Sequence, residues 1–589
     1  MSAVQPQFRP NQPLSASKIP IPPVETRTHT LSAGTVVKEG AHPLDCDIRI
    51  DEDQPITLRD GVVLYGDVYR PAGATDQLPA VMMYTPYSKH GGYWNTAFYP
   101  TNFGVPPQDL SGLNAFEALD PGYWCAHGYA IVVVDSRGTS NSGGDMRFMG
   151  VGEGEDVYDA IEWIAAQPWS NGAVGMAGNS KLCISQWAAA ALNPPHLKAI
   201  APWEGLTDLY RDVIVRGGIP DVTFNERDIY SFIFGLAGIE DIASMAKTNP
   251  LFDSYWASKV ADLSQVSAAV YVGASWSNPI HTRGTLAAFS QLPPEKTWMR
   301  IHDTQEWIDL ADPASMDDLR AFYDRFLKGL DNGWENTPRV RYTVLDPGGV
   351  DQTNLVAPQW PLVSAERELF CDAQTLALVS ETPADASHAS YVSTELTDSL
   401  RFTMDVVEDV TLYGGLCLNL WVSSDDGDDA DVFVALYKED ATGNRQHHIT
   451  LRAAAAQAFV RSLEHDGKLP AAVSYTGPVG RLRASHRALN HELSTVREPV
   501  HLHTREDRLK RGEPVELHIG LWPTAMKLRA GERLVVEVAG HPVGPLAMHM
   551  PGESGLPGGD INMTTRNVGT HTIHTGGEYR SRLNFAVLV

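Results

Sequence analysis

The sequence predicts an α/β domain built on a parallel sheet, a helical insertion into it, and an all-β domain behind it. Three observations support this prediction. Short apolar runs alternate with amphipathic segments between residues 46 and 204, as in a parallel sheet flanked by helices. An irregular, aromatic and helix-like segment follows at 205–262. Beyond residue 336, short alternating runs are separated by turn residues, which is typical of an antiparallel sandwich.

Each predicted strand of the parallel sheet is a short apolar run that ends in polar or glycine residues. The candidates are residues 78–87, 129–138, 173–180, 267–275 and 297–302. A helix is predicted at 155–169, where Val157, Ile161 and Ile164 recur at helical spacing and a Pro-Trp-Ser-Asn-Gly stretch ends the pattern. The alternation of strands and helices favours parallel connections throughout this region.

The chain has 589 residues, which is too long for one hydrophobic core, so several domains are expected. The predicted parts are an extended N-terminal arm at 1–45, a sheet domain at 46–204 and 263–335, a helical cap at 205–262, and a β-sandwich at 336–589.

Composition limits the partners and the compartment. The net charge of -26 argues against nucleic acid or an anionic membrane as a partner. Five scattered cysteines without C-x-x-C spacing indicate neither a disulfide framework nor a zinc site. No apolar run approaches the length of a membrane span. We therefore expect a cytoplasmic protein, and a homodimer is left open.

The stretch GNSKLCISQW, residues 178–187, holds the candidate nucleophile Ser180. A Gly-x-Ser triplet alone is weak evidence, because the chain contains several. Only Ser180 lies between a short buried strand and an Ala-rich helix, the strand-turn-helix arrangement that exposes a serine hydroxyl at the edge of an α/β sheet. The amide groups at the start of that helix can also stabilise an oxyanion.

A serine nucleophile needs a base, and His302 is the best-placed candidate. It lies at the end of a predicted strand downstream of Ser180, in agreement with the chain order serine, acid, histidine. The acid of such a triad is expected at the end of the intervening strand at 267–275. The polar residue found there is Asn278.

Several further stretches resemble the CocE/NonD family of hydrolases, the family of cocaine esterase, X-prolyl dipeptidyl aminopeptidase and α-amino acid ester hydrolases. They are LRDGVVLYGDVYRP, VMMYTPYSKH, DSRGTSNSGG, QPWSNGAVGMAGNS, APWEGLTDLYRD, SWSNPIHTRGTLAAF, FYDRFLKGLDNGW and NVGTHTIHTGGEY, in the family's order. The resemblance implies an α/β-hydrolase domain with an inserted helical cap and a C-terminal jelly roll of the galactose-binding type.

The resemblance also implies the chemistry, which is cleavage of an ester or amide through an acyl-enzyme. Ser180 resembles the nucleophile and His302 the general base, while the backbone N–H of Lys181 and the hydroxyl of Tyr87 resemble the oxyanion donors. The implied substrate is a small-molecule ester or amide, and neither a metal site nor a cofactor is implied.

Three positions depart from the family pattern: Lys181, Cys183 and Asn278. An asparagine in place of a triad aspartate typically lowers turnover by about 10⁴-fold, so Asn278 matters most. Three interpretations stay open: Asn278 orients His302 in a slow hydrolase, another carboxylate such as Asp303 or Glu306 replaces it, or the enzyme catalyses acyl transfer, cyclisation, elimination or rearrangement instead. The Lys181 side chain is expected to line the pocket, with a Ser-Lys dyad as the less favoured alternative.

Overall fold

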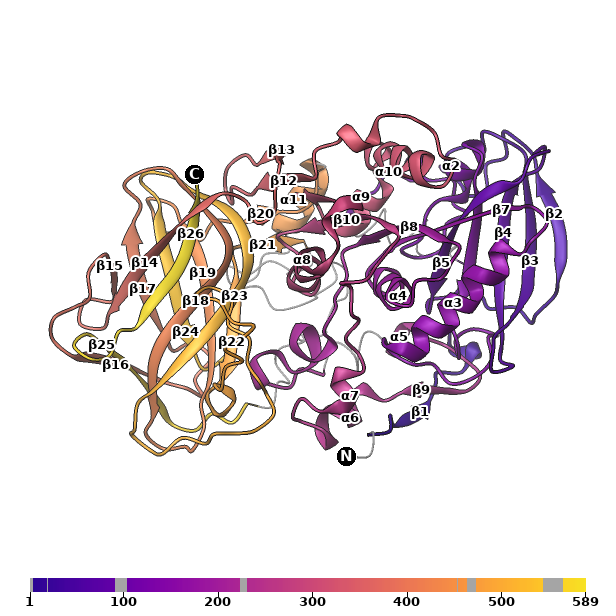
Figure 1. The fold of residues 1–589 in the computed structure, drawn as a ribbon. Coiled ribbons are helices and arrows are strands. Elements are labelled where there is room, and N and C mark those ends of the chain that lie inside the picture. Colours follow the sequence, from indigo (N-terminus) through magenta and orange to yellow (C-terminus); the bar gives the residue numbers. More distant parts are fainter. Residues whose placement is uncertain are drawn as a thin grey trace. The chain divides into compact units, whose positions relative to one another are not determined.

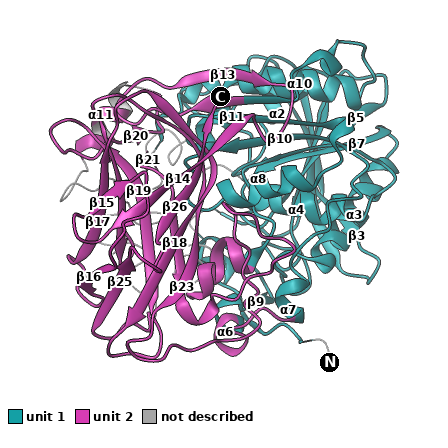
Figure 2. Cartoon of the chain, turned by 60° about the vertical axis from the view of Figure 1, so that its left-hand side comes forward, with its two compact units in different colours: residues 1–209, 224–245, 254–341 teal, residues 210–223, 246–253, 342–589 magenta. Residues whose placement is uncertain are grey.

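The structure is a computed structural model that describes residues 4–17, 20–90, 103–222, 230–452, 454–462, 473–543 and 565–589 (Figure 1). The chain forms two compact units, coloured teal and magenta in Figure 2. Unit 1 comprises residues 1–209, 224–245 and 254–341, and unit 2 comprises residues 210–223, 246–253 and 342–589.

Unit 1 is organised around a mixed sheet with the order β11-β10-β8-β7-β5-β6-β4-β3-β2. Its strands are β2 (Arg27–Leu31), β3 (Ile48–Thr57), β4 (Val63–Pro71), β5 (Leu78–Thr85), β6 (Ala130–Asp135), β7 (Ser170–Asn179), β8 (Leu197–Trp203), β10 (Ala269–Ser275) and β11 (Thr297–His302). Strands β6, β5, β7, β8, β10 and β11 are parallel to one another, and β2, β3 and β4 join them through antiparallel pairings, with β4 beside β6. The carboxyl ends of these six parallel strands therefore meet at one edge.

Helices cover both faces of this sheet. They are α2 (Pro121–Ala126), α3 (Val151–Ala165), α4 (Lys181–Ala190), α8 (Thr282–Gln291), α9 (Glu306–Ala311) and α10 (Pro313–Phe326). In Figure 1, α3, α4 and α8 lie on one side of the strands and α2 and α10 on the other. Strand β6 has the sequence AIVVVD, whose first five residues are apolar and mostly β-branched, and it is buried along its whole length, as a strand covered on both faces must be.

Local signals explain where the helices begin. The carboxylate of Asp312 accepts hydrogen bonds from the N–H groups of Ala314 and Ser315, and Pro313 occupies the first position of α10. Helix α3 begins after Gly150, whose φ of 84° is unfavourable for other residues. The prediction of an α/β-hydrolase sheet with flanking helices is confirmed.

Unit 2 contains a sheet that closes on itself. Its order is β18-β23-β22-β19-β24-β17-β15-β14-β26, and β26 pairs again with β18. The strands are β14 (Ser364–Asp372), β15 (Ala377–Val379), β17 (Ser399–Asp405), β18 (Val410–Ser424), β19 (Asp431–Glu439), β22 (Val479–Arg483), β23 (Val515–Leu528), β24 (Arg533–Ala539) and β26 (Arg582–Leu588), with β16 (Ser387–Val392) and β25 (Thr570–Thr575) beside β18. The predicted C-terminal all-β domain is confirmed.

The segment predicted as a cap at 205–262 is shared between the two units. Within unit 2, the Tyr210 hydroxyl donates to the carbonyl of Pro250 at 2.7 Å, and the Phe252 N–H donates to the carbonyl of His503 at 2.9 Å. Within unit 1, β1 (Phe8–Pro10) pairs with β9 (Gly238–Glu240). The described part of the segment also contains the short helices α5 (Tyr230–Phe232), α6 (Ile242–Thr248) and α7 (Ser254–Ala257), a π-helix at Tyr210–Ile214 and a 3-10 helix at Arg216–Gly218.

Candidate active site

Ser180 lies in the sharp turn between β7 and α4, at the edge where the parallel strands end. Its φ of 54° and ψ of −121° are in a region that non-glycine residues seldom adopt, and such strain persists only where surrounding structure enforces it. The Ser180 N–H donates to the carbonyl of Glu204 at 2.8 Å. At Gly178, where φ is 111°, a Cβ atom would come within 2.7 Å of Leu182. The backbone therefore holds Ser180 at the tip of the turn.

A buried carboxyl that the sequence did not single out lies near the turn that holds Ser180. Glu117 is in the loop before α2, and the Ser180 hydroxyl and the Lys181 N–H both favour its ionised form. Its Oε1 atom accepts a hydrogen bond of 3.2 Å from Nε1 of Trp307. Glu117 is 2% exposed, and this burial raises its pKa to about 8 although these three groups act in the opposite direction.

His302 lies at the end of β11, where the sequence predicted it, but it faces other groups. Its Nε2 is 2.8 Å from Oε1 of Glu204, and its Nδ1 is 3.4 Å from the Thr304 hydroxyl. Burial lowers the pKa of His302, but the nearby carboxylates of Asp309 and Glu204 outweigh burial and raise it. Both ring nitrogens thus contact groups other than Ser180 in the part of the chain that the structure describes. The role of His302 as general base stays a prediction.

Asn278 follows β10 and supports the start of α8. Its Oδ1 accepts hydrogen bonds from the N–H groups of Ile280 at 3.0 Å and His281 at 3.1 Å. Its side chain also favours the ionised form of the nearby Glu306 carboxyl. These contacts satisfy amide groups that the first turn of a helix leaves unpaired. The contacts of Asn278 are therefore with helix α8 and with Glu306. None of these contacts involves the His302 ring.

Glu306, in the first turn of α9, completes a group of buried carboxyls. Its Oε2 accepts a hydrogen bond of 3.2 Å from Nδ2 of Asn179 and lies 3.9 Å from Nε2 of His281. Burial, followed by the charges of Glu204 and Glu117, raises the pKa of Glu306 well above its usual value. Burial also lowers the pKa of His281 to about 4, so its imidazole is neutral at pH 7.

Asn278→Asp is expected to destabilise the protein more at pH 8 than at pH 5. The new carboxylate can still accept hydrogen bonds from the N–H groups at the start of α8, but it lies next to the Glu306 carboxyl. Two like charges repel once both groups are ionised. Thermal unfolding of the variant and the unchanged protein at both pH values measures the difference. Asn193→Asp, at an exposed residue whose Oδ1 also accepts from a backbone N–H, is the control. An Asn278→Asp protein as stable as the original at pH 8 would contradict the expectation.

The two predicted oxyanion donors follow neighbouring strands of the sheet. The Lys181 N–H begins α4, and Tyr87 follows β5, the strand next to β7. Tyr87 is buried, and its ring lies edge-on to Phe116 with 5.1 Å between the ring centroids. The ammonium group of Lys181 forms an ion pair with the buried carboxylate of Glu153. This ion pair disfavours both expected uses of the lysine side chain, as a lining group of the pocket and as the partner of a Ser-Lys dyad.

A buried lysine anchors the loop that carries Tyr87. Nζ of Lys89 lies 2.6 Å from Oδ1 of Asp53 and 2.9 Å from Oδ1 of Asp67, and the Lys89 N–H donates to Oδ1 of Asp135 at 2.8 Å. Burial lowers the pKa of Lys89, but the carboxylates reverse this and the pKa is raised. Lys89 therefore stays charged and holds its loop to β4 and β6.

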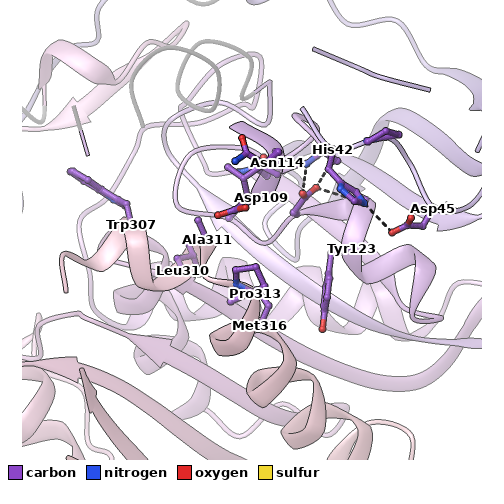
Figure 3. A pocket seen from close by; sticks show the side chains of 17 residues that line it. His42, Asp45, Asp109, Asn114, Tyr123, Trp307, Leu310, Ala311, Pro313 and Met316 are labelled. Atoms are coloured by element: carbon purple, nitrogen blue, oxygen red, sulfur yellow. Dashed lines mark hydrogen bonds and ion pairs between the residues drawn. The ribbon is translucent and has the colours of Figure 1, made fainter. Parts of the chain in front are cut away.

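A cavity of about 210 Å³ lies beside Trp307 within unit 1 (Figure 3). Figure 3 shows the side chains of α9 and α10 on one side and those of the loops around residues 42–45 and 108–114 on the other. The lining residues include Trp307, Leu310, Ala311, Pro313, Met316, Leu110, Asn114, Asp109, Asp45, His42 and Tyr123. Because Trp307 also donates to Glu117, one residue borders both the cavity and the carboxylate at Ser180.

Sequence patterns missed Glu117, Glu204 and His281. Glu204 directly follows a buried strand, which is a signal that could have been used. Glu117 lies in an irregular loop where no periodicity or motif marks it. Among the described residues, no group of three histidine, cysteine or acidic side chains is arranged to hold a metal ion, and no helix is both long and apolar enough to cross a membrane.

Comparisons with known proteins match both units. Residues 60–230 match the model of the X-Pro dipeptidyl-peptidase (S15 family), and residues 332–584 match that of the X-Pro dipeptidyl-peptidase C-terminal non-catalytic domain. A CocE/NonD family hydrolase from Staphylococcus aureus is 31% identical with a TM-score of 0.85, and the match covers 96% of this chain and 97% of that one.

Two other similar proteins are more distant or match over a shorter stretch. Cocaine esterase from Rhodococcus sp. (strain MB1 Bresler) is 34% identical over 169 residues, which are 28% of this chain and 26% of the esterase. The chain thus matches about a quarter of the length of that curated relative. The structure of an α-amino acid ester hydrolase is 16% identical with a TM-score of 0.66, over 92% of this chain and 97% of that chain, so it shares the fold.

Proposed function

Because the chain belongs to the CocE/NonD family of hydrolases, we propose that it cleaves an ester or amide bond of a small molecule through an acyl-enzyme on Ser180. The observation that carries the proposal is the conformation of Ser180, whose φ of 54° places it at the tip of a strand-turn-helix. Maintaining this strained backbone is useful where the hydroxyl must be presented to a substrate.

The backbone around Ser180 can stabilise the charge that develops during attack. When the serine oxygen bonds to a carbonyl carbon, the carbonyl oxygen becomes an oxyanion. The Lys181 N–H and the Tyr87 hydroxyl are the proposed donors to that oxygen. The amide belongs to the first turn of α4, where the helix dipole also favours negative charge.

The step on which sequence and geometry differ is the removal of the serine proton. The family resemblance implies His302 as the base, with its imidazole oriented from the position of Asn278. In the structure, Nε2 of His302 is 2.8 Å from Glu204, and Asn278 contacts α8 and Glu306. The nucleophile is thus supported by its own geometry, independently of these two residues.

Mapping a covalent adduct tests the proposed nucleophile. A fluorophosphonate reacts with a serine hydroxyl that a protein activates, so we expect stoichiometric labelling on the peptide that contains Ser180. Mass spectrometry of the digested protein identifies the site. Labelling that is absent, or that falls mainly on another serine such as Ser140 or Ser275, would count against the proposal.

A second function on the same scaffold is favoured by the contacts of Asn278. Without an acid at this position to orient the imidazole, hydrolysis can give way to acyl transfer, cyclisation, elimination or rearrangement. Incubation of an activated ester with and without added alcohols or amines separates the cases. Free acid as the product supports hydrolysis, whereas a stable Ser180 adduct released only by an added acceptor supports acyl transfer.

A further inference from the structure

We propose that Glu204 is the carboxylate that positions His302 and stabilises its imidazolium, the role that the family resemblance gives to the position of Asn278. The inference rests on the proposed hydrolytic function. A short contact carries it, because Oε1 of Glu204 lies 2.8 Å from Nε2 of His302. The acid of a serine triad holds the histidine ring in one orientation and stabilises the positive charge that the ring acquires.

The pair formed by Glu204 and His302 is shielded from water. The two side chains are 2% and 3% exposed, so solvent does little to screen their attraction. Apart from this imidazole, no hydrogen-bond donor among the described residues is placed at either carboxylate oxygen of Glu204. A buried carboxylate is costly unless a positive group compensates it. The imidazole of His302 is therefore the group that can compensate the charge of Glu204.

The backbone of Glu204 is fixed at the edge where the parallel strands end. Glu204 directly follows β8 and has a φ of 49°, a conformation that non-glycine residues seldom adopt. Its carbonyl accepts a hydrogen bond from the Ser180 N–H, and its N–H donates to the carbonyl of Gly273 in β10, both at 2.8 Å. The N–H of the next residue, Gly205, donates to Oγ1 of Thr285 at 2.9 Å. Glu204 is therefore attached both to the turn that holds the nucleophile and to β10.

The other nitrogen of the ring agrees with this role. Nδ1 of His302 lies 3.4 Å from the Thr304 hydroxyl, which can donate to an unprotonated nitrogen. The proton of the neutral ring is then on Nε2, next to the carboxylate of Glu204. Nδ1 is left as the basic nitrogen. Hydrogen bonds between a base and its nucleophile often tighten only in the complex with substrate.

Asp309 is the other carboxyl close to the ring, but an arginine engages it. Its Oδ2 atom lies 3.7 Å from Nε2 of His302, farther away than Oε1 of Glu204. Nη1 and Nη2 of Arg300 each donate to one oxygen of Asp309 at 2.7 Å. Such a two-pronged pair compensates the charge of the carboxylate. Glu204 has no such cation among the described residues, so its charge acts on the imidazole.

The proposed step conserves atoms and charge. As the oxygen of Ser180 bonds to the carbonyl carbon, its proton moves to Nδ1 of His302 and the carbonyl oxygen becomes the oxyanion. The imidazolium that forms lies beside the Glu204 carboxylate, which lowers the energy of this charged state. When the intermediate collapses, the bond to the leaving group breaks and His302 returns the proton to that group. Water repeats the sequence, and Ser180 regains a proton as the acid is released.

The pH profile of fluorophosphonate labelling tests the proposal without knowledge of the natural substrate. In the original protein, the second-order rate constant at Ser180 should rise with pH as His302 loses its proton, and then level off. The carboxylates of Asp309 and Glu204 raise the pKa of His302, so removal of one charge should lower it. Glu204→Gln should move the midpoint of the profile to lower pH by about one pH unit or more and lower the plateau by about 10²- to 10⁴-fold.

Two further variants complete the comparison. Glu204→Asp keeps the charge on a shorter side chain, so the midpoint should stay near the original and the plateau should fall by less than about tenfold. Glu162→Gln is the matched control, because Oε2 of Glu162 lies 2.6 Å from Nδ1 of His196 in a similar pair. His196 precedes β8, at the opposite end of that strand from Glu204. Glu162→Gln should therefore label like the original protein at every pH.

A direct measurement covers the case in which Glu204→Gln does not fold. Titration of the His302 ring by NMR, in the original protein with labelled histidine, gives the pKa of its imidazole. We expect a pKa above the ordinary histidine value, because the charges of Asp309 and Glu204 outweigh burial. A pKa below the ordinary value would contradict the proposal without any variant of Glu204.

Three labelling results would overturn the inference and leave the proposed function standing. A lower plateau with an unchanged midpoint in Glu204→Gln would show that Glu204 is needed only for the structure. Faster labelling of Glu204→Gln would show that the carboxylate holds His302 away from the serine. Unchanged labelling of His302→Gln would exclude His302 as the base. Absence of labelling at Ser180 in the original protein would instead reject the proposed function itself.

Discussion

Ser180→Ala is expected to lower kcat on an ester substrate by at least about 10⁴-fold, which corresponds to roughly 5.5 kcal/mol of transition-state stabilisation. The substitution removes the oxygen that forms the acyl-enzyme and leaves the oxyanion donors in place. Residual turnover would come from binding and from those donors alone. The Ser180 hydroxyl also favours the ionised form of Glu117, so its loss should raise the pKa of that buried carboxyl further.

Two comparisons separate lost chemistry from lost structure. Ser290→Ala, at an exposed position of α8, should retain full activity. Ser180→Gly should be as inactive as the alanine variant but more stable, because glycine accepts the φ of 54° without strain. Steady-state kinetics and thermal unfolding of the purified variants provide the measurements. Turnover of Ser180→Ala within tenfold of the original would exclude Ser180 as the nucleophile.

Lys89→Met is expected to destabilise the protein by about 3–5 kcal/mol and to lower kcat in the protein that still folds. The substitution leaves the carboxylates of Asp53 and Asp67 without the cation that both contact within 3 Å. An uncompensated charge in a buried position is costly, because no solvent replaces the lost partner. The loop that carries Tyr87 also loses its attachment to β4, so one oxyanion donor is displaced.

The pH dependence of unfolding identifies the cause of this loss. Lower pH protonates the carboxyls that have lost their cation. Lys89→Met should therefore recover part of its stability between pH 7 and pH 5 relative to the original protein. Chemical denaturation at the two pH values measures this. Lys198→Met, the same change at an exposed lysine of β8, should be nearly neutral. A Lys89→Met protein with unchanged stability at pH 7 would show that the ion pairs are not needed.

The elements of unit 1 follow from local patterns. The strand expected at 297–302 is β11, Thr297–His302, and that at 267–275 contains β10, Ala269–Ser275. Buried parallel strands are short apolar runs with polar ends, and this pattern can be recognised from residues that are adjacent in the sequence. The division of the segment at 205–262 between two units has no such local signature, because it depends on which distant surface each part packs against.

The position of Ser180 was likewise predictable, since the strand-turn-helix arrangement of a serine nucleophile requires a strand, a turn with the serine and a helix in succession. The carboxyls around the site were not predictable. Glu117 comes from an irregular loop, and the imidazole of His302 at the end of β11 lies against Glu204. By itself, the sequence determined the parallel sheet, the C-terminal β domain and the place of the nucleophile, because each depends on adjacent residues. Only the tertiary structure decided which carboxyls lie against His302 and His281, because those contacts depend on how loops from separate strands pack at one edge of the sheet.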